Sequence, residues 1–149
     1  MLKLTALAIA GISLLGVSGD KEWKATLAAR DGSQIEGTAD VKAKSADSTA
    51  MDIEIQKATA STSYAWHMHN GNCAANGSVV GAPNTYPVLK TNDKGSGEVE
   101  ATLAIPAPAS GEYSVHVHAP SADTAAVGMT VACGDLKPAG GDLKPGGGQ

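Results

Sequence analysis

The four histidines of this 149-residue chain occur as two His-x-His units and nowhere else. One unit holds His67 and His69, and the other holds His116 and His118. Both units stand in segments that read as β-strands, and in a strand residues two apart share one face. Each unit would therefore present two imidazoles on one side. Because imidazole nitrogen is a common metal ligand, the pattern predicts a single metal site built from two strands.

The residues between the histidines predict which face of each strand forms the core. Tyr64, Trp66 and Met68 alternate with the first histidine pair, and Val115 and Val117 alternate with the second. We expect these bulky side chains to point inward and the histidines to point outward. The imidazoles would then converge only if the two strands are neighbours or meet across a sheet edge.

Composition narrows the class of protein. The chain is long enough for one domain, and aromatic residues make up only 3% of it, with no Phe, so the core must be largely aliphatic. The formal net charge is −4 and there is no run of Lys or Arg. Nucleic acid is therefore not an expected partner.

Short alternating segments separated by turn signals recur along the chain. They cover residues 23–27, 34–43, 51–56, 64–69, 98–105, 113–119 and 128–133, and residues 87–91 read as either a short strand or an ordered turn. Turn signals such as Asn92 to Gly95 separate them, and no long helical periodicity is present. The pattern predicts an all-β fold, an antiparallel Greek-key β-sandwich or barrel of about seven to eight strands.

The two ends of the chain have a different composition. An apolar run from Leu4 to Val17 is too short to span a bilayer and precedes small residues, which is typical of a signal peptide at 1–19. We therefore expect a periplasmic or secreted protein with no membrane span. The β-domain would occupy 20–136. Residues 137–149 are rich in Gly and Pro, and we expect a disordered tail there.

The chain has two cysteines, Cys73 and Cys133. In an exported protein such a pair favours a disulfide, which would close a loop of about 60 residues and stabilise the fold by roughly 4 kcal/mol. The other interpretation makes the cysteines metal ligands, since Cys73 lies close to His69 in the sequence. An oxidising compartment favours the disulfide.

Several segments, in order, resemble motifs of the copper/zinc superoxide dismutase family. They are residues 31–38, 66–69, 88–95, 117–120 and 131–136, and Cys73 follows the first histidine pair at a similar distance. The short histidine motifs are also similar to those of CHRD domains, but the setting of Cys73 and of residues 132–134 favours the dismutase. The resemblance implies a dismutase-like fold.

Carried over to this chain, the resemblance makes His67, His69 and His118 copper ligands. His116 has no counterpart in the family, and by alternation it is placed to replace the family's bridging histidine. Residues 70–86, where the family supplies zinc ligands, contain no histidine and no acidic residue, so no zinc is expected. Thr130 stands where the family has its active-site arginine.

Three functions follow from these residues. The first is an exported copper-binding protein with one copper site and no zinc site. The second is a copper-only superoxide dismutase, which converts superoxide to oxygen and hydrogen peroxide, although its arginine and bridging histidine are not matched and no catalytic residue is assigned. The third is a metal-free structural or adhesion module. The sequence makes no prediction of oligomeric state.

Overall fold

The computed structural model describes residues 21–121 and 127–139. The expected signal peptide at 1–19 and residues 140–149 of the expected tail lie outside these residues. The described elements are β1 (Glu22–Ala29), β2 (Glu36–Ser45), β3 (Ser48–Gln56), β4 (Ser63–Asn70), a 3₁₀ turn η1 (Pro83–Thr85), β5 (Leu89–Lys90), β6 (Gly97–Leu103), β7 (Tyr113–His118), β8 (Thr130–Asp135) and β9 (Lys137–Pro138).

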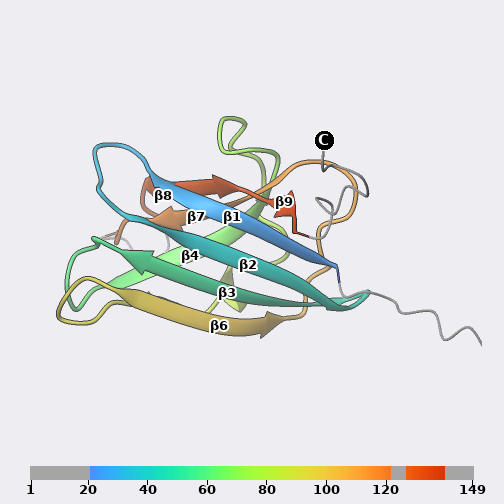
Figure 1. Cartoon of the computed structure of the whole chain (residues 1–149), viewed down its shortest axis with the longest axis horizontal. Coiled ribbons are helices and arrows are strands. Elements are labelled where there is room, and N and C mark those ends of the chain that lie inside the picture. Colours follow the sequence, from blue (N-terminus) through green and yellow to red (C-terminus); the bar gives the residue numbers. More distant parts are fainter. Residues whose placement is uncertain (1–20, 122–126, 140–149) are drawn as a thin grey trace, which may run out of the picture.

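The strands form one antiparallel sheet in the order β5-β4-β7-β8-β1-β2-β3-β6. It curls into two layers, with β1, β2, β3 and β6 in front of β4 and β7 in Figure 1. Strand β1 makes the corner, because residues 22–27 pair with β2 whereas Ala28 and Ala29 pair with β8. A bridge between Thr91 and Gly97 joins the two free ends of the sheet. The result is a nearly closed barrel, which confirms the predicted antiparallel all-β fold.

Alternation along the strands produces the core. In β3, Met51, Ile53 and Ile55 are buried, while the residues between them lie on the opposite face. In β4, Trp66 and Met68 are fully buried, and the Trp66 indole donates a hydrogen bond to the Pro87 carbonyl at 2.7 Å. The expectation that these two side chains belong to the core is confirmed.

The ordered domain reaches beyond the expected boundary at residue 136. Lys137–Pro138 forms β9, which pairs with β1, and the Ala139 N–H donates to the Glu22 carbonyl at 2.8 Å. The neighbouring Leu136 side chain is buried and fixes the start of this segment. The first residues of the expected tail are therefore part of the sheet.

A disulfide joins Cys73 to Cys133, and neither cysteine is free. It ties the chain that follows β4 to strand β8, which confirms the predicted bond over the alternative of cysteine metal ligands. No helix within the described residues is long and apolar enough to cross a membrane.

Candidate metal centre

Strands β4 and β7 are direct neighbours, which is one of the two arrangements that allow the histidines to converge. His67 lies opposite His116, His118 lies opposite Ala65, and Ser114 lies opposite His69. Directly opposed residues in an antiparallel pair project to the same face. All four imidazoles therefore lie on one side of the β4–β7 ladder, away from Trp66 and its neighbours.

The histidine face is not exposed, contrary to expectation. Each of the four side chains is at most 7% exposed. The chain after β4 folds back along that strand, where the Val80 N–H donates to the Met68 carbonyl at 2.8 Å and Val79 forms a bridge with His69. This edge of β4 is open because β5 pairs only with Ser63 and Tyr64. The prediction identified the correct side of the sheet but missed the segment that covers it.

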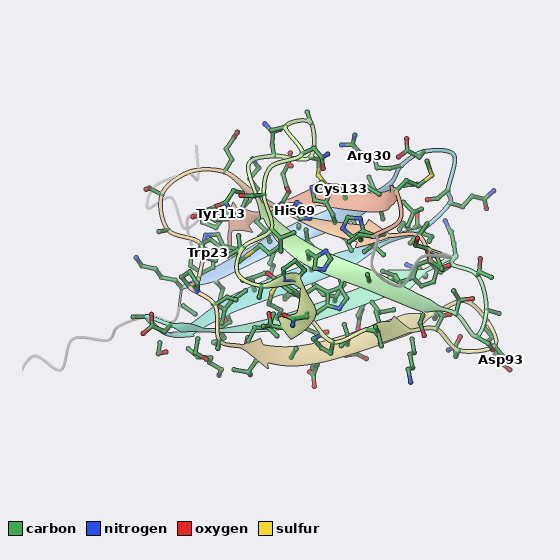
Figure 2. The ribbon with its side chains drawn as sticks, turned by 180° about the vertical axis from the view of Figure 1, so that it is seen from behind. Trp23, Arg30, His69, Asp93, Tyr113 and Cys133 are labelled. Carbon is green, nitrogen blue, oxygen red and sulfur yellow. A yellow bond between two sulfur atoms is a disulfide. The ribbon has the colours of Figure 1, made fainter. Side chains whose placement is uncertain are left out.

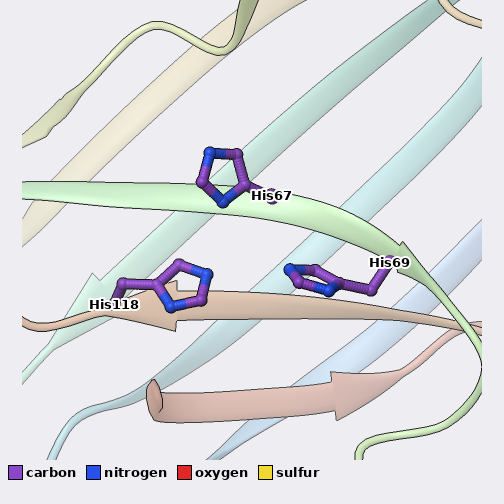
Figure 3. A group of neighbouring side chains, drawn as sticks. All are labelled: His67, His69 and His118. Carbon is purple, nitrogen blue, oxygen red and sulfur yellow. The ribbon is translucent and has the colours of Figure 1, made fainter. Parts of the chain in front are cut away.

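Three of the histidines form a compact cluster (Figure 3). One ring nitrogen from each of His67, His69 and His118 lies within 4.8 Å of the others. Three buried nitrogen atoms lack any hydrogen-bond partner in the described part of the chain: His67 Nδ1, His69 Nε2 and His118 Nε2. Buried polar atoms are rarely left without a partner, and doing so costs about 1–3 kcal/mol each. Three such atoms in one place make this cluster the candidate ligand-binding centre.

Backbone carbonyls fix the protonation of two of these rings. His69 Nδ1 lies 2.7 Å from the Gly77 carbonyl, and His118 Nδ1 lies 3.2 Å from the Gly128 carbonyl. A carbonyl oxygen only accepts, so both Nδ1 atoms must carry a hydrogen. With Nδ1 as the donor to the carbonyl, Nε2 is the ring atom left to offer a lone pair to a metal. This is the arrangement in which a backbone carbonyl orients a histidine for metal binding.

Both of these carbonyls belong to glycines that closely approach another segment. A Cβ at Gly77 would lie 1.9 Å from the Asn70 carbonyl oxygen, and one at Gly128 would lie 2.1 Å from the Ala119 carbonyl oxygen. No side chain fits at such distances, so glycine is required at both positions. Neither glycine was predicted from the sequence to have a role. Their only sequence signal is their position: Gly77 follows the first histidine strand, and Gly128 comes shortly before the strand that follows the second.

The His67 ring packs against an aromatic side chain. The Tyr86 ring packs edge-on against the His67 ring with centroids 5.1 Å apart, and it packs against Trp66 at the same distance. The Tyr86 hydroxyl donates to the Val80 carbonyl at 2.7 Å, and burial raises the pKa of this phenol to about 12. Tyr86 therefore stays neutral, and it links His67 to the segment that covers the site.

Burial keeps two rings of the cluster, His67 and His118, uncharged near neutral pH. Burial, followed by the neighbouring His67 and His69, lowers the pKa of His118 to about 4. Burial and the neighbouring His69 also lower the pKa of His67, against an opposing hydrogen bond with the Pro83 backbone. Both imidazoles are neutral at pH 7. Only the neutral ring can donate a lone pair to a metal.

The structure places His116 differently from the other three. Its ring centroid is 4.2 Å from that of His69, but both of its nitrogens are hydrogen-bonded within the protein. The Ser114 hydroxyl donates to the Gly71 carbonyl at 2.9 Å, so it must accept from His116 Nε2 at 3.0 Å. His116 Nδ1 then accepts from the Thr130 hydroxyl at 3.2 Å. The geometry thus brings together three of the four predicted ligands.

The three free nitrogens fit a transition-metal ion. Metal–imidazole bonds are about 2.0–2.1 Å long, so ligands on one ion lie about 3–3.5 Å apart. The three ligand atoms lie within 4.8 Å of one another, so the rings would have to move closer together to hold one ion. Within the described residues, the cluster contains no thiolate and no carboxylate, so the donor set is entirely nitrogen.

The comparisons with known proteins assign neither a family nor a function to this chain. No protein-family model matches this chain, and a search of curated proteins finds no match. The resemblance to superoxide dismutases stays a prediction from short motifs. The properties of the site rest on the geometry of its own residues.

Proposed function

We propose that this protein binds one copper ion through His67 Nδ1, His69 Nε2 and His118 Nε2. The observation that carries the proposal is the convergence of three buried nitrogen atoms without hydrogen-bond partners. Two of them have lone pairs aimed at the cluster because glycine carbonyls hold the opposite nitrogen. Protonation does not compete near neutral pH, since burial keeps His67 and His118 neutral.

The donor set favours copper over other metals. Imidazole suits copper, zinc, iron and nickel, and among divalent first-row ions copper is bound most tightly. Calcium and magnesium prefer oxygen ligands, which this cluster does not supply. Three histidines also hold zinc in some proteins, so competition between copper and zinc is the decisive comparison.

The residues around the cluster support holding an ion more than turning over a substrate. The neutral Tyr86 ring packs beside His67. The Gly77 and Gly128 carbonyls orient the rings of His69 and His118. Copper would supply a redox-active centre, but position 130, where the resemblance implies an arginine, holds an uncharged threonine bonded to His116. Copper storage or transfer is therefore the proposed role, ahead of superoxide dismutation.

The proposed setting is outside the cytoplasm. A disulfide and the absence of a membrane-spanning helix in the described part are compatible with an extracellular location. Disulfides persist mainly in oxidising compartments. Export by a signal peptide at 1–19 belongs to this proposal.

The test is metal competition on the purified protein. The protein is offered equal amounts of Cu(II) and Zn(II), and bound metal is measured after removal of the free ions. We expect about one copper and little zinc, with nitrogen hyperfine structure in the Cu(II) EPR spectrum. A preference for zinc, or a spectrum without nitrogen couplings, would contradict the proposal. A superoxide assay on the same sample separates a binding protein from an enzyme.

A further inference from the structure

A second group of potential ligands lies beside the three-histidine cluster and shares no residue with it. A ring nitrogen of His116 and the sulfur atoms of Cys73 and Cys133 lie within 4.8 Å of one another. His116 on β7 and Cys133 on β8 are direct cross-strand partners, and both are buried. Figure 2 shows Cys133 in the same part of the molecule as His69.

The surrounding residues hold this group independently of the sulfur–sulfur bond. The Cys73 N–H donates to Asp135 Oδ1 at 2.7 Å, which links the loop after β4 to the end of β8. The Asn72 side chain accepts from the N–H groups of Ala74 and Ala75 at 3.0 and 2.9 Å and fixes the turn that contains Cys73. The Gly71 N–H donates to the Glu112 carbonyl at 2.8 Å. These bonds keep both cysteines beside His116 when the disulfide is broken.

We propose that reduction of the Cys73–Cys133 disulfide creates a second metal site, in which the two thiolates and His116 bind a soft cation such as Cu(I). A dithiol reductant supplies two electrons and two protons. The protein disulfide breaks, two thiols form, and a disulfide forms in the reductant. Binding of the cation then displaces the two thiol protons. The disulfide form of a dithiol reverses these steps: it accepts two electrons from the thiolates and two protons from solvent, the protein disulfide forms again, and the cation is released.

The chemistry of the three residues matches this role. Thiolates select soft ions such as Cu(I), and two cysteines with one histidine form a common three-ligand set. His116 Nδ1 has a lone pair that now accepts from the Thr130 hydroxyl. Thr130 is half-buried, so its hydroxyl can turn towards water when the nitrogen is used. Cys73 is half-buried and within reach of a reductant and of a metal donor.

The inference does not depend on copper at the three-histidine cluster. The test therefore uses the His67→Gln/His69→Gln variant, in which that cluster is disabled. The protein is reduced without oxygen, freed of reductant and titrated with Cu(I) against a chromophoric chelator. We expect one Cu(I) per reduced chain and none per oxidised chain. Reduced protein also titrated with Co(II) should show a thiolate-to-cobalt charge-transfer band.

Two further variants distinguish a built site from a pair of loose thiols. Adding Cys73→Ser/Cys133→Ser should abolish Cu(I) binding. Adding His116→Gln should weaken it by more than about tenfold and shift the cobalt bands, because one ligand is lost. If the reduced chain takes up no Cu(I), the proposal fails. It also fails if affinity is the same with and without His116, which is the result expected from thiols in an unfolded chain.

Discussion

Two clusters in this protein each bring three potential metal ligands close together, and their environments are opposite. His67, His69 and His118 lie beneath the segment that follows β4. Asp52, Glu98 and Glu100 lie on the outer face of β3 and β6, and both glutamates are exposed. Ligand atoms in each cluster are within 4.8 Å of one another. Distance alone therefore does not separate a binding site from a charged surface.

The difference lies in what holds each group. All three histidines are buried, burial keeps His67 and His118 neutral, and backbone carbonyls orient the rings of His69 and His118. The carboxylates repel one another. Burial, followed by the charges of Glu98 and Glu100, raises the pKa of Asp52. Two like-charged pairs, Asp52 with Glu100 and Glu54 with Glu98, lie directly opposite across the strands, which is an unfavourable arrangement. One oxygen of Asp52 is buried without a hydrogen-bond partner among the described residues, whereas Glu98 and Glu100 are exposed, where water and counterions screen their charges.

The largest expected effect tests this comparison directly. His67→Ala/His69→Ala removes two of the three free nitrogens, and we expect copper affinity to fall by more than about a thousandfold. That exceeds the 10–100-fold typical of losing a residue that only orients a ligand. The matched control, Asp52→Asn/Glu100→Gln, removes two of the three carboxylates and should leave copper affinity unchanged. Isothermal titration with Cu(II) measures both. Equal losses of copper affinity in the two variants would show that the histidine cluster and the acidic cluster do not differ in this way.

The second prediction concerns the Cys73–Cys133 disulfide, which anchors the segment that follows β4 and covers the histidines. Its two cysteines are separated by 60 positions in the sequence. Cys73→Ser/Cys133→Ser should lower the free energy of unfolding by about 2–5 kcal/mol, because the unfolded chain gains entropy. The midpoint of thermal unfolding should fall by roughly 10 °C or more. Calorimetry on the oxidised wild type and the variant provides the measurement, and equal midpoints would contradict the prediction.

The third prediction uses the neutral histidines. Burial lowers the pKa values of both His116 and His118 to about 4 in the folded protein, whereas an unfolded histidine titrates near 6.5. Between these pH values the unfolded state binds more protons, so the free energy of unfolding falls as pH decreases. Each histidine contributes a loss of up to roughly 3 kcal/mol by pH 4, and none above pH 7.

Urea denaturation of copper-free protein from pH 7.5 to pH 4 measures this loss. Because carboxylates also titrate towards the acid end, His118→Gln serves as the matched variant. It should show a smaller decrease in stability between pH 6.5 and pH 4 than the wild type. An identical pH dependence would mean that His118 accepts a proton in the folded state as easily as in the unfolded one.

The fourth prediction concerns the carbonyls that orient the rings. Gly128→Ala places a Cβ 2.1 Å from the Ala119 carbonyl oxygen, so the backbone must shift and the carbonyl that bonds His118 moves with it. We expect copper affinity to fall by about 10–100-fold. Gly32→Ala is the control, because Gly32 also lies in a loop but a Cβ there would have no neighbour within 4 Å. The control should lose stability from its positive φ and keep its affinity for copper.

The strands were predictable because their signal is local. Alternation in residues 51–56 and 64–69 identified β3 and β4 and the inward direction of Trp66. The count of two cysteines, taken with the expected export, was enough to pair Cys73 with Cys133. Burial of the histidines was not predictable, because residues 77–86 cover them and have no periodicity. The resemblance already set His116 apart from the other three, but alternation could not, since the orientation of its ring depends on the hydroxyls of Ser114 and Thr130.

The smallest expected effect lies at the acidic cluster. Glu100→Lys places a positive charge directly opposite Asp52, in a cross-strand row that continues through Asp40 to its ion-pair partner Lys24. A like-charge pair becomes an opposite-charge pair, so the free energy of unfolding should rise by about 0.2–1 kcal/mol. The gain should shrink in high salt, because Glu100 is exposed and its interactions are screened.

Asp93→Lys is the control for net charge, since Asp93 is exposed in the turn between β5 and β6, far from the labelled His69 in Figure 2. It changes the net charge by the same amount without a facing carboxylate, and its effect on stability should be close to zero. Urea unfolding of both variants at low and high salt makes the comparison. If Glu100→Lys destabilises the protein, or if added calcium stabilises the wild type but not this variant, then the carboxylates form a cation site. The acidic face would then be a second binding surface, and the contrast with the histidine face would fail.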